Sequence, residues 1–173
     1  MANRAGKYKL SKKESALSLV DGGTVTGNLT LGADTQLQIT SPVSGSATAM
    51  TISKATHAGR TVMLPQNVAA GVVHVMPAPE VGVHYHFVRV GTAVANEDIS
   101  FASDAASAFF EGAIGFHDDA GGSDLGTVYC DGTTEDLIDL KVPGAVDLHF
   151  VGKSSTVYYV YGNVSSATIF TCT

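Results

Sequence analysis

Val146-Asp-Leu-His-Phe-Val151 and Thr156-Val-Tyr-Tyr-Val-Tyr161 are two short runs rich in β-branched and aromatic residues. The residues between them, Gly152-Lys-Ser-Ser155, include the Gly and Ser that are typical of a turn. Tyr158 and Tyr159 are neighbours in the second run, so they point to opposite faces of a strand. At least one of these two phenols is therefore expected at a surface or an interface.

Similar runs recur at intervals of about ten residues from residue 41 onward, separated by Gly, Pro, Asn or Asp. Many short strands with regular turn signals predict an all-β fold, either a sandwich or a barrel. The connections are too short for βαβ crossovers, so antiparallel pairing is expected. The predicted strands are Ala49–Ile52, Thr61–Leu64, Val72–Met76, Val83–Val90, Asp98–Phe101, Ala113–Phe116, Thr127–Cys130, Asp136–Lys141, Val146–Val151, Thr156–Tyr161 and Thr168–Cys172.

The first 40 residues have a different organisation. Gly23–Gly32 alternates apolar or Gly residues with Thr and Asn, which predicts a strand with one hydroxyl-rich face, and Gln36–Thr40 continues this pattern. Ser11–Leu19 could form two helical turns, with Ser11 as N-cap and Glu14 completing a capping box. These segments cannot close a core alone, so they are expected to pair with the body or with a neighbouring chain.

Charge divides the chain into a basic arm and an acidic body. The net charge is −6, yet five of the ten basic residues lie within the first 13 positions. We predict an extended arm over 1–22 and a β-rich body over 23–173, with 23–54 as an alternative small β segment of its own. An acidic body argues against nucleic-acid binding, and a basic arm suits a tether to an acidic surface. The expected contact residues of the arm are Arg4, Lys7, Tyr8, Lys9, Leu10, Lys12 and Lys13.

Composition excludes several classes of protein. Apolar residues make up 45% of the chain and charged residues 15%, as in ordered globular proteins. No run approaches the roughly 20 apolar residues that span a bilayer, and no apolar segment follows the basic N-terminus as in a secretory signal. The protein is therefore expected to stay in a cytosol until it is assembled. Cys130 and Cys172 are too few and too distant for a disulfide framework or a zinc site, so free thiols are expected.

His84-Tyr85-His86 is the arrangement with the most metal-ligand character. Residues i and i+2 of a strand share a face, so the two imidazoles would converge. The triplet superficially resembles that of cupins, but the Glu that follows there is replaced here by Val88-Arg-Val-Gly91. Surface or interface histidines are therefore expected, with a metal site at His84 and His86 as the alternative.

Other candidate sites are weaker still. His117, Asp118, Asp119, Asp124 and Asp131 have the acidic composition of ordinary loops and fit no calcium-binding loop. His57, His74 and His149 stand alone and are interpreted as ordinary strand residues. The sequence lacks a Gly-x-Ser-x-Gly elbow, and Gly121-Gly-Ser123 is not followed at loop spacing by the Gly-Lys-Ser/Thr of a phosphate-binding loop, so neither catalysis nor a cofactor is expected.

Several motifs resemble those of virion proteins. Decoration proteins of tailed-bacteriophage heads have a Gly, a short β run ending in Leu-Pro, a Gly-led strand, and later Val-Gly-Thr, Gly-Thr-Val and Asp-Gly-Thr-Thr segments. The chain is similar to this family over roughly residues 55–170, and Gly23–Leu31 separately resembles a Val-Thr-Gly-Asn-Leu-Thr-Leu segment near the start of phage fibre proteins. The matching segments are Gly59–Pro65, Ala70–Val75, Val90–Thr92, Gly126–Val128 and Asp131–Thr134.

This resemblance implies a non-enzymatic decoration, or cement, protein. Such a protein would form a homotrimer on the outer face of the virion, bind the major capsid protein through its N-terminal arm and stabilise the expanded head. Neither nucleic acid nor membrane is an expected partner. The expected subunit interface contains Tyr158, Tyr159 and Tyr161. A short head or tail fibre acting as an adhesin is the first alternative, and a metal-binding barrel protein using His84 and His86 is the second.

Overall fold

Two long strands, β9 (Pro143–Gly152) and β10 (Val157–Ser166), pair antiparallel near the centre of the larger of two sheets. The computed structural model describes residues 42–66, 68–69, 71–91, 97–104, 108–118 and 125–173. The predicted arm, its seven contact residues, the Ser11–Leu19 helix and the strands before residue 42 lie outside these ranges. Among the described residues, no helix is long and apolar enough to cross a membrane.

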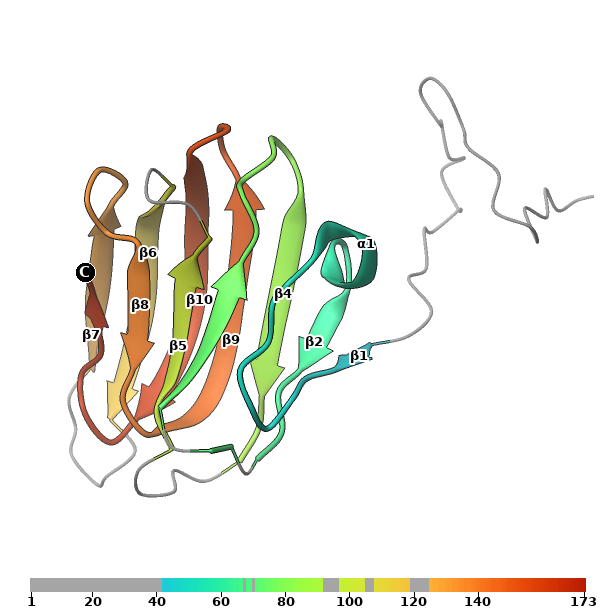
Figure 1. The fold of residues 1–173 in the computed structure, drawn as a ribbon. Helices are drawn as coiled ribbons and strands as arrows, with labels where there is room; N and C mark the ends of the chain where they lie inside the picture. Colours follow the sequence, from blue (N-terminus) through green and yellow to red (C-terminus); the bar gives the residue numbers. More distant parts are fainter. Residues whose placement is uncertain (1–41, 67, 70, 92–96, 105–107, 119–124) are drawn as a thin grey trace, which may run out of the picture. The chain divides into compact units, whose positions relative to one another are not determined.

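The described strands form a seven-stranded and a four-stranded sheet, which Figure 1 shows as two layers. The larger sheet has the order β1-β2-β4-β9-β10-β6-β7, and the smaller has the order β11-β8-β5-β3. The strands of the larger sheet besides β9 and β10 are β1 (Val43–Ser44), β2 (Thr61–Met63), β4 (His84–Arg89), β6 (Phe109–Asp118) and β7 (Leu125–Asp131). Those of the smaller sheet are β3 (Val72–Met76), β5 (Ile99–Ser103), β8 (Leu137–Leu140) and β11 (Thr171–Cys172).

The all-β prediction is confirmed, but the prediction of antiparallel pairing is wrong for several strands. Parallel pairs join β1 to β2, β2 to β4, β3 to β5, and β6 to β10, so both sheets are mixed. The physical reason is that the chain alternates between sheets. In the sequence, β3 comes after β2 and before β4, but it lies in the smaller sheet. The chain therefore crosses to the other sheet and back, and this supplies the crossover that the parallel neighbours β2 and β4 require, without a helix.

Most predicted strands lie within a few residues of an observed one, with one clear exception. Ala49–Ile52 is not a strand, since only an isolated bridge joins Thr51 to Val75. The short helix α1 (Lys54–His57) follows, with the side chain of Ser53 accepting a hydrogen bond from the Thr56 amide as N-cap. His57 therefore belongs to a helix, and the interpretation of this residue as a strand residue is wrong.

Aromatic side chains from both sheets form the centre of the core. Phe101 of β5 packs 4.8 Å from Phe87 of β4 and 5.2 Å from Phe150 of β9, measured between ring centroids. Phe110 and Tyr158 extend this cluster along the larger sheet, and all five side chains are fully buried. Burying one such side chain contributes about 1.5–3 kcal/mol, so the cluster is a major part of what holds the two sheets together.

Cys130 and Cys172 form a disulfide, which corrects the prediction of free thiols. Cys130 lies on β7 and Cys172 on β11, the edge strands of the larger and smaller sheets. The two cysteines are 42 residues apart in the sequence, which does not indicate a disulfide, but the packing of the two sheets places their Cα atoms 5.5 Å from each other. The disulfide therefore joins the two layers at one edge.

His74 is a buried histidine of the core. It lies on β3 against Phe101, is fully buried, and has no hydrogen-bond partner for either ring nitrogen among the described residues. Burial lowers the pKa of His74 from 6.5 to about 4, because the charged imidazolium would lose its hydration. His74 is consequently neutral in the folded protein at pH 7.

We predict that reducing the disulfide destabilises the protein. Removing a cross-link across 42 residues should lower the free energy of unfolding by about 4 kcal/mol, mainly by freeing the unfolded chain. Urea denaturation with and without dithiothreitol measures this difference. A Cys130→Ser/Cys172→Ser variant serves as the control and should not respond to reductant. Superimposable curves for the reduced and oxidised wild-type protein would contradict the prediction.

We predict that His74 makes the protein less stable in acid. Below pH 6.5 the unfolded chain protonates His74, whereas the folded chain does so only near pH 4, so stability falls between these two values. The loss due to this residue is about 3 kcal/mol. Urea midpoints of the wild type and His74→Leu between pH 7 and 4 test this, since the variant should lose less stability. Equal losses in both proteins would show that His74 is not responsible.

Candidate functional site

Among the residues that the structure describes, most of the large exposed apolar side chains lie on the outer face of the larger sheet, the side turned away from the core. Strand residues alternate between core and solvent, so every second residue of β2, β4, β9, β10, β6 and β7 points outward. The exposed large apolar residues on or bordering this face are Met63, Val90, Leu125, Tyr129, Tyr159 and Tyr161. Apolar exposure is therefore concentrated on one side of the molecule.

Strand register aligns histidines and tyrosines across this face. His86 of β4 lies opposite His149 of β9, and His149 lies opposite Tyr161 of β10. Ala113 of β6 and Tyr129 of β7 continue the same row. A single line of residues thus crosses five neighbouring strands, although its members come from distant parts of the sequence.

The rings in this row stack. The centroids of His86 and His149 are 4.0 Å apart with an interplanar angle of 7°, and those of His149 and Tyr161 are 4.8 Å apart at 5°. His84 stacks on His149 at 5.2 Å, and Tyr159 lies 5.8 Å from Tyr161. We call these five residues the histidine–tyrosine stack.

Hydrogen bonds fix the imidazoles of the stack. His86 Nε2 lies 2.7 Å from Asp147 Oδ1, and His86 Nδ1 lies 3.1 Å from Thr61 Oγ1. His84 Nε2 lies 2.9 Å from His149 Nδ1, which leaves His149 Nε2 directed toward Asp147 Oδ1 at 3.5 Å. Both nitrogens of His86 and of His149 therefore have a neighbouring polar partner.

Two of the stacked histidines favour the neutral form. The pKa of His84 is lowered by burial and by the nearby charges of His149 and His86. The pKa of His149 is lowered by burial and by His86, while Asp147 partly opposes this effect. Closely packed imidazoles disfavour each other's protonation because like charges repel.

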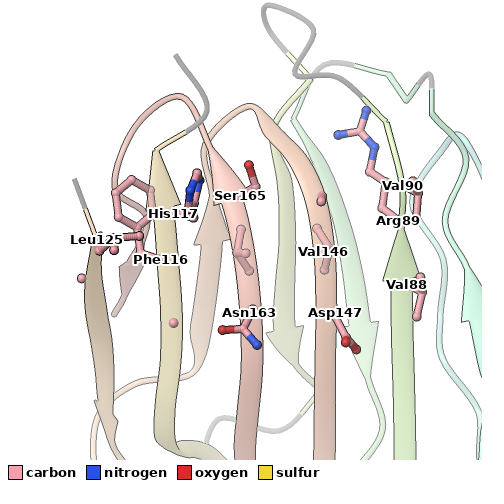
Figure 2. A pocket seen from close by; sticks show the side chains of 14 residues that line it. Val88, Arg89, Val90, Phe116, His117, Leu125, Val146, Asp147, Asn163 and Ser165 are labelled. Atoms are coloured by element: carbon pink, nitrogen blue, oxygen red, sulfur yellow. The ribbon is translucent and has the colours of Figure 1, made fainter. Parts of the chain in front are cut away.

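A hollow of about 560 Å³ lies beside the stack on the outer face. The hollow is lined in part by three small residues, which leave space between larger neighbours: Gly115, Gly126 and Ala145. Figure 2 shows Val88, Asp147 and Asn163 on adjacent strands within this hollow, with Ser165, His117 and Leu125 toward one end. The lining thus combines apolar side chains with a few polar groups.

A buried arginine fixes the strand ends at this hollow. The Arg89 guanidinium pairs with the Glu97 carboxylate at 2.7 Å and also donates hydrogen bonds to the carbonyls of Pro143 and Gln66. These contacts connect the end of β4 to the start of β9 and to the segment before β5. Because a buried charge without a partner is costly, these contacts restrict the relative movement of the strands.

The predicted site residues are distributed as follows. His84 and His86 share one face of β4 as expected, but their ring centroids are 6.4 Å apart and each contacts a residue of β9 instead. Sequence reasoning missed those residues, His149 and Asp147, which lie more than 60 residues away in the chain. His117 is not part of the stack. The Asp131 carboxylate stabilises its own turn, because it accepts hydrogen bonds from the amides of Thr133 and Thr134.

The three tyrosines expected at a subunit interface have different environments. Tyr159 and Tyr161 are 45% and 40% exposed on the outer face. Tyr158 is fully buried in the core and donates a hydrogen bond to the carbonyl of Pro77, so its assignment to an interface is wrong. Burial also raises the pKa of the Tyr158 phenol. The expectation that at least one of Tyr158 and Tyr159 is exposed is confirmed.

The chain matches no protein-family model, no curated protein sequence and no solved structure.

Proposed function

We propose that the protein is a decoration protein that binds the outer surface of a phage capsid and stabilises the expanded head. The observation that carries this proposal is the concentration of exposed apolar and aromatic side chains on the outer face of the larger sheet. Contiguous apolar surface and exposed tyrosines are typical of protein interfaces. A surface of this kind suits a protein whose function is to contact neighbouring subunits.

In this proposal the outer face and the N-terminal arm have separate roles. Tyr159 and Tyr161 pack against a second copy of the chain and contribute to a homotrimer, while the basic arm over 1–22 binds the coat subunits. Each trimer adds buried area across boundaries between coat subunits. Because the protein binds the expanded shell and not the unexpanded one, binding stabilises the expanded state.

The disulfide is compatible with this location. Disulfides persist in oxidising surroundings, and the outer surface of a released virion is exposed to such an environment. The cross-link would then reinforce the folded body after release from the host cytoplasm, where the chain is made.

An adhesin is the second candidate function, favoured by the hollow beside the histidine–tyrosine stack. A volume of about 560 Å³ lies within the range of small-ligand sites, and the hollow presents Asp147, Asn163 and Ser165 beside the tyrosines. Polar groups next to aromatic rings suit a sugar. A fibre or adhesin should bind glycans or host cells without a capsid, whereas a decoration protein should bind expanded shells.

We predict that the outer face holds the trimer together. Tyr159→Ser/Tyr161→Ser should dissociate it, because central interface tyrosines often contribute about 2 kcal/mol or more each. Light scattering coupled to gel filtration measures the mass. Val81→Ser removes a residue that is 75% exposed outside the strands, and this matched control should remain trimeric. A wild-type monomer, or a trimer in the double variant, would contradict the prediction.

We predict that deleting residues 1–20 abolishes capsid binding and leaves the body folded. The deletion removes all five basic residues of the arm, and with them the attraction to an acidic capsid surface. Co-sedimentation with expanded shells of the coat protein from the same virus measures binding, and circular dichroism measures folding. Wild-type binding by the folded, truncated protein would refute the role of the arm, and failure of the full chain to bind shells would refute the function.

A further inference from the structure

Strands β4 and β9 bring together a group of side chains suited to a transition-metal ion. His86 and His149 occupy opposite positions on these antiparallel neighbours, and Asp147 precedes His149 by two residues on the same face. One ligand atom from each of the three lies within 4.8 Å of the others. This is the only such group of His, Cys, Asp or Glu among the described residues.

The distances within this group are close to those of a metal centre. Zinc–nitrogen and zinc–oxygen bonds of about 2.0–2.2 Å in a tetrahedron place neighbouring ligand atoms roughly 3.3 Å apart. Asp147 Oδ1 lies 2.7 Å from His86 Nε2 and 3.5 Å from His149 Nε2. The three potential ligand atoms lie within 4.8 Å of one another, so modest side-chain movements would bring them to the spacing that an ion needs.

Partners behind the ligands fix their orientation. His86 Nδ1 contacts Thr61 Oγ1 and His149 Nδ1 contacts His84 Nε2, so in each ring the nitrogen opposite the site has its own partner. Metal-binding histidines generally hold their second nitrogen in this way, which sets the ring orientation and the tautomer. His84 is consequently a positioning residue, whereas His86, His149 and Asp147 supply the ligand atoms.

We propose that His86, His149 and Asp147 bind a divalent transition-metal ion such as Zn²⁺ on the outer face. Two imidazoles and one carboxylate are typical ligands of zinc and of similar ions. Calcium and magnesium are disfavoured, because they require several oxygen ligands and the group offers one carboxylate. Three protein ligands leave a fourth position for water or for a donor from a bound partner.

Binding requires a small rearrangement. The rings of His86 and His149 are nearly parallel, so both must tilt for their Nε2 lone pairs to point at one ion. Asp147 is 59% exposed, which gives its carboxylate freedom to adjust. Tyr161 stacks on His149 at 4.8 Å, so its fluorescence should report on an ion bound at that ring, and the chain has no Trp to mask the signal.

The test uses the full chain without a polyhistidine tag, freed of metal with EDTA and titrated with Zn²⁺ or Co²⁺. Calorimetry should give one site per chain, and Co²⁺ should produce the visible absorption of a four-coordinate ion. Co²⁺ should also quench tyrosine fluorescence, less so in Tyr161→Phe. Millimolar Ca²⁺ should not compete. Absence of saturable binding by the wild-type protein would overturn the proposal.

Variants locate the ion. His86→Ala, His149→Ala and Asp147→Asn should each weaken Zn²⁺ binding by about 100-fold or more, since even partners behind the ligands account for about 10–100-fold. His117→Ala, an exposed histidine at the end of β6, is the matched control and should bind like the wild type. Wild-type affinity in both His86→Ala and His149→Ala would place the metal elsewhere and refute the site.

The role of His84 needs a separate measurement. His84→Ala should weaken Zn²⁺ binding by about 10-fold and shift the Co²⁺ absorption, because the His149 ring loses its partner. His84→Asn, which keeps a hydrogen-bond acceptor, should restore most of the affinity. An unchanged spectrum and affinity in His84→Ala would show that His84 does not position the ligand.

Discussion

The aromatic cluster between the two sheets sets the register on which the rest of the structure depends. Phe87, Phe150 and Tyr158 lie on three adjacent strands of the larger sheet and point into the core together. Because strand residues alternate between faces, their burial forces His86, His149 and Tyr161 to point outward. A slip of one residue in β4 or β9 would place an imidazole in the core and a phenylalanine in water, and a slip in β10 would expose Tyr158.

The two faces of the sheet are therefore linked by one constraint. The core contacts stabilise the larger sheet and fix its strand register. The outward-pointing residues of neighbouring strands are aligned with one another because the inward-pointing residues fix this register. Each stacking and hydrogen-bonding contact on the outer face adds little alone, since exposed pairs contribute on the order of 1 kcal/mol. The outer arrangement persists because the buried side chains fix the strands on which it is built.

Much of the fold follows from local sequence. The short runs with period-two alternation and regular turn signals predicted the strands, and Val72–Met76 has the predicted bounds. The parallel pairs could not be predicted, because they depend on the chain alternating between sheets, as β3 does between β2 and β4. The disulfide depends on the same packing, since Cys130 and Cys172 meet only when the edges of the two sheets do.

The candidate site could be predicted only in part. The sequence indicates His84 and His86 as an i, i+2 pair, but His149 and Asp147 become their neighbours only through the pairing of β4 with β9.

The outer face is bordered by a buried ion pair that connects strand ends. Arg89 and Glu97 are buried at its edge, where an uncompensated charge would cost about 3–5 kcal/mol. The guanidinium also donates hydrogen bonds to the carbonyls of Pro143 and Gln66, so the pair holds the start of β9 against the end of β4. These two strands also carry His86, Asp147 and His149. A metal ion, a sugar or a neighbouring subunit would each lose less entropy on binding to such a fixed surface than to a mobile one, which connects the rigidity of the fold to a role in binding.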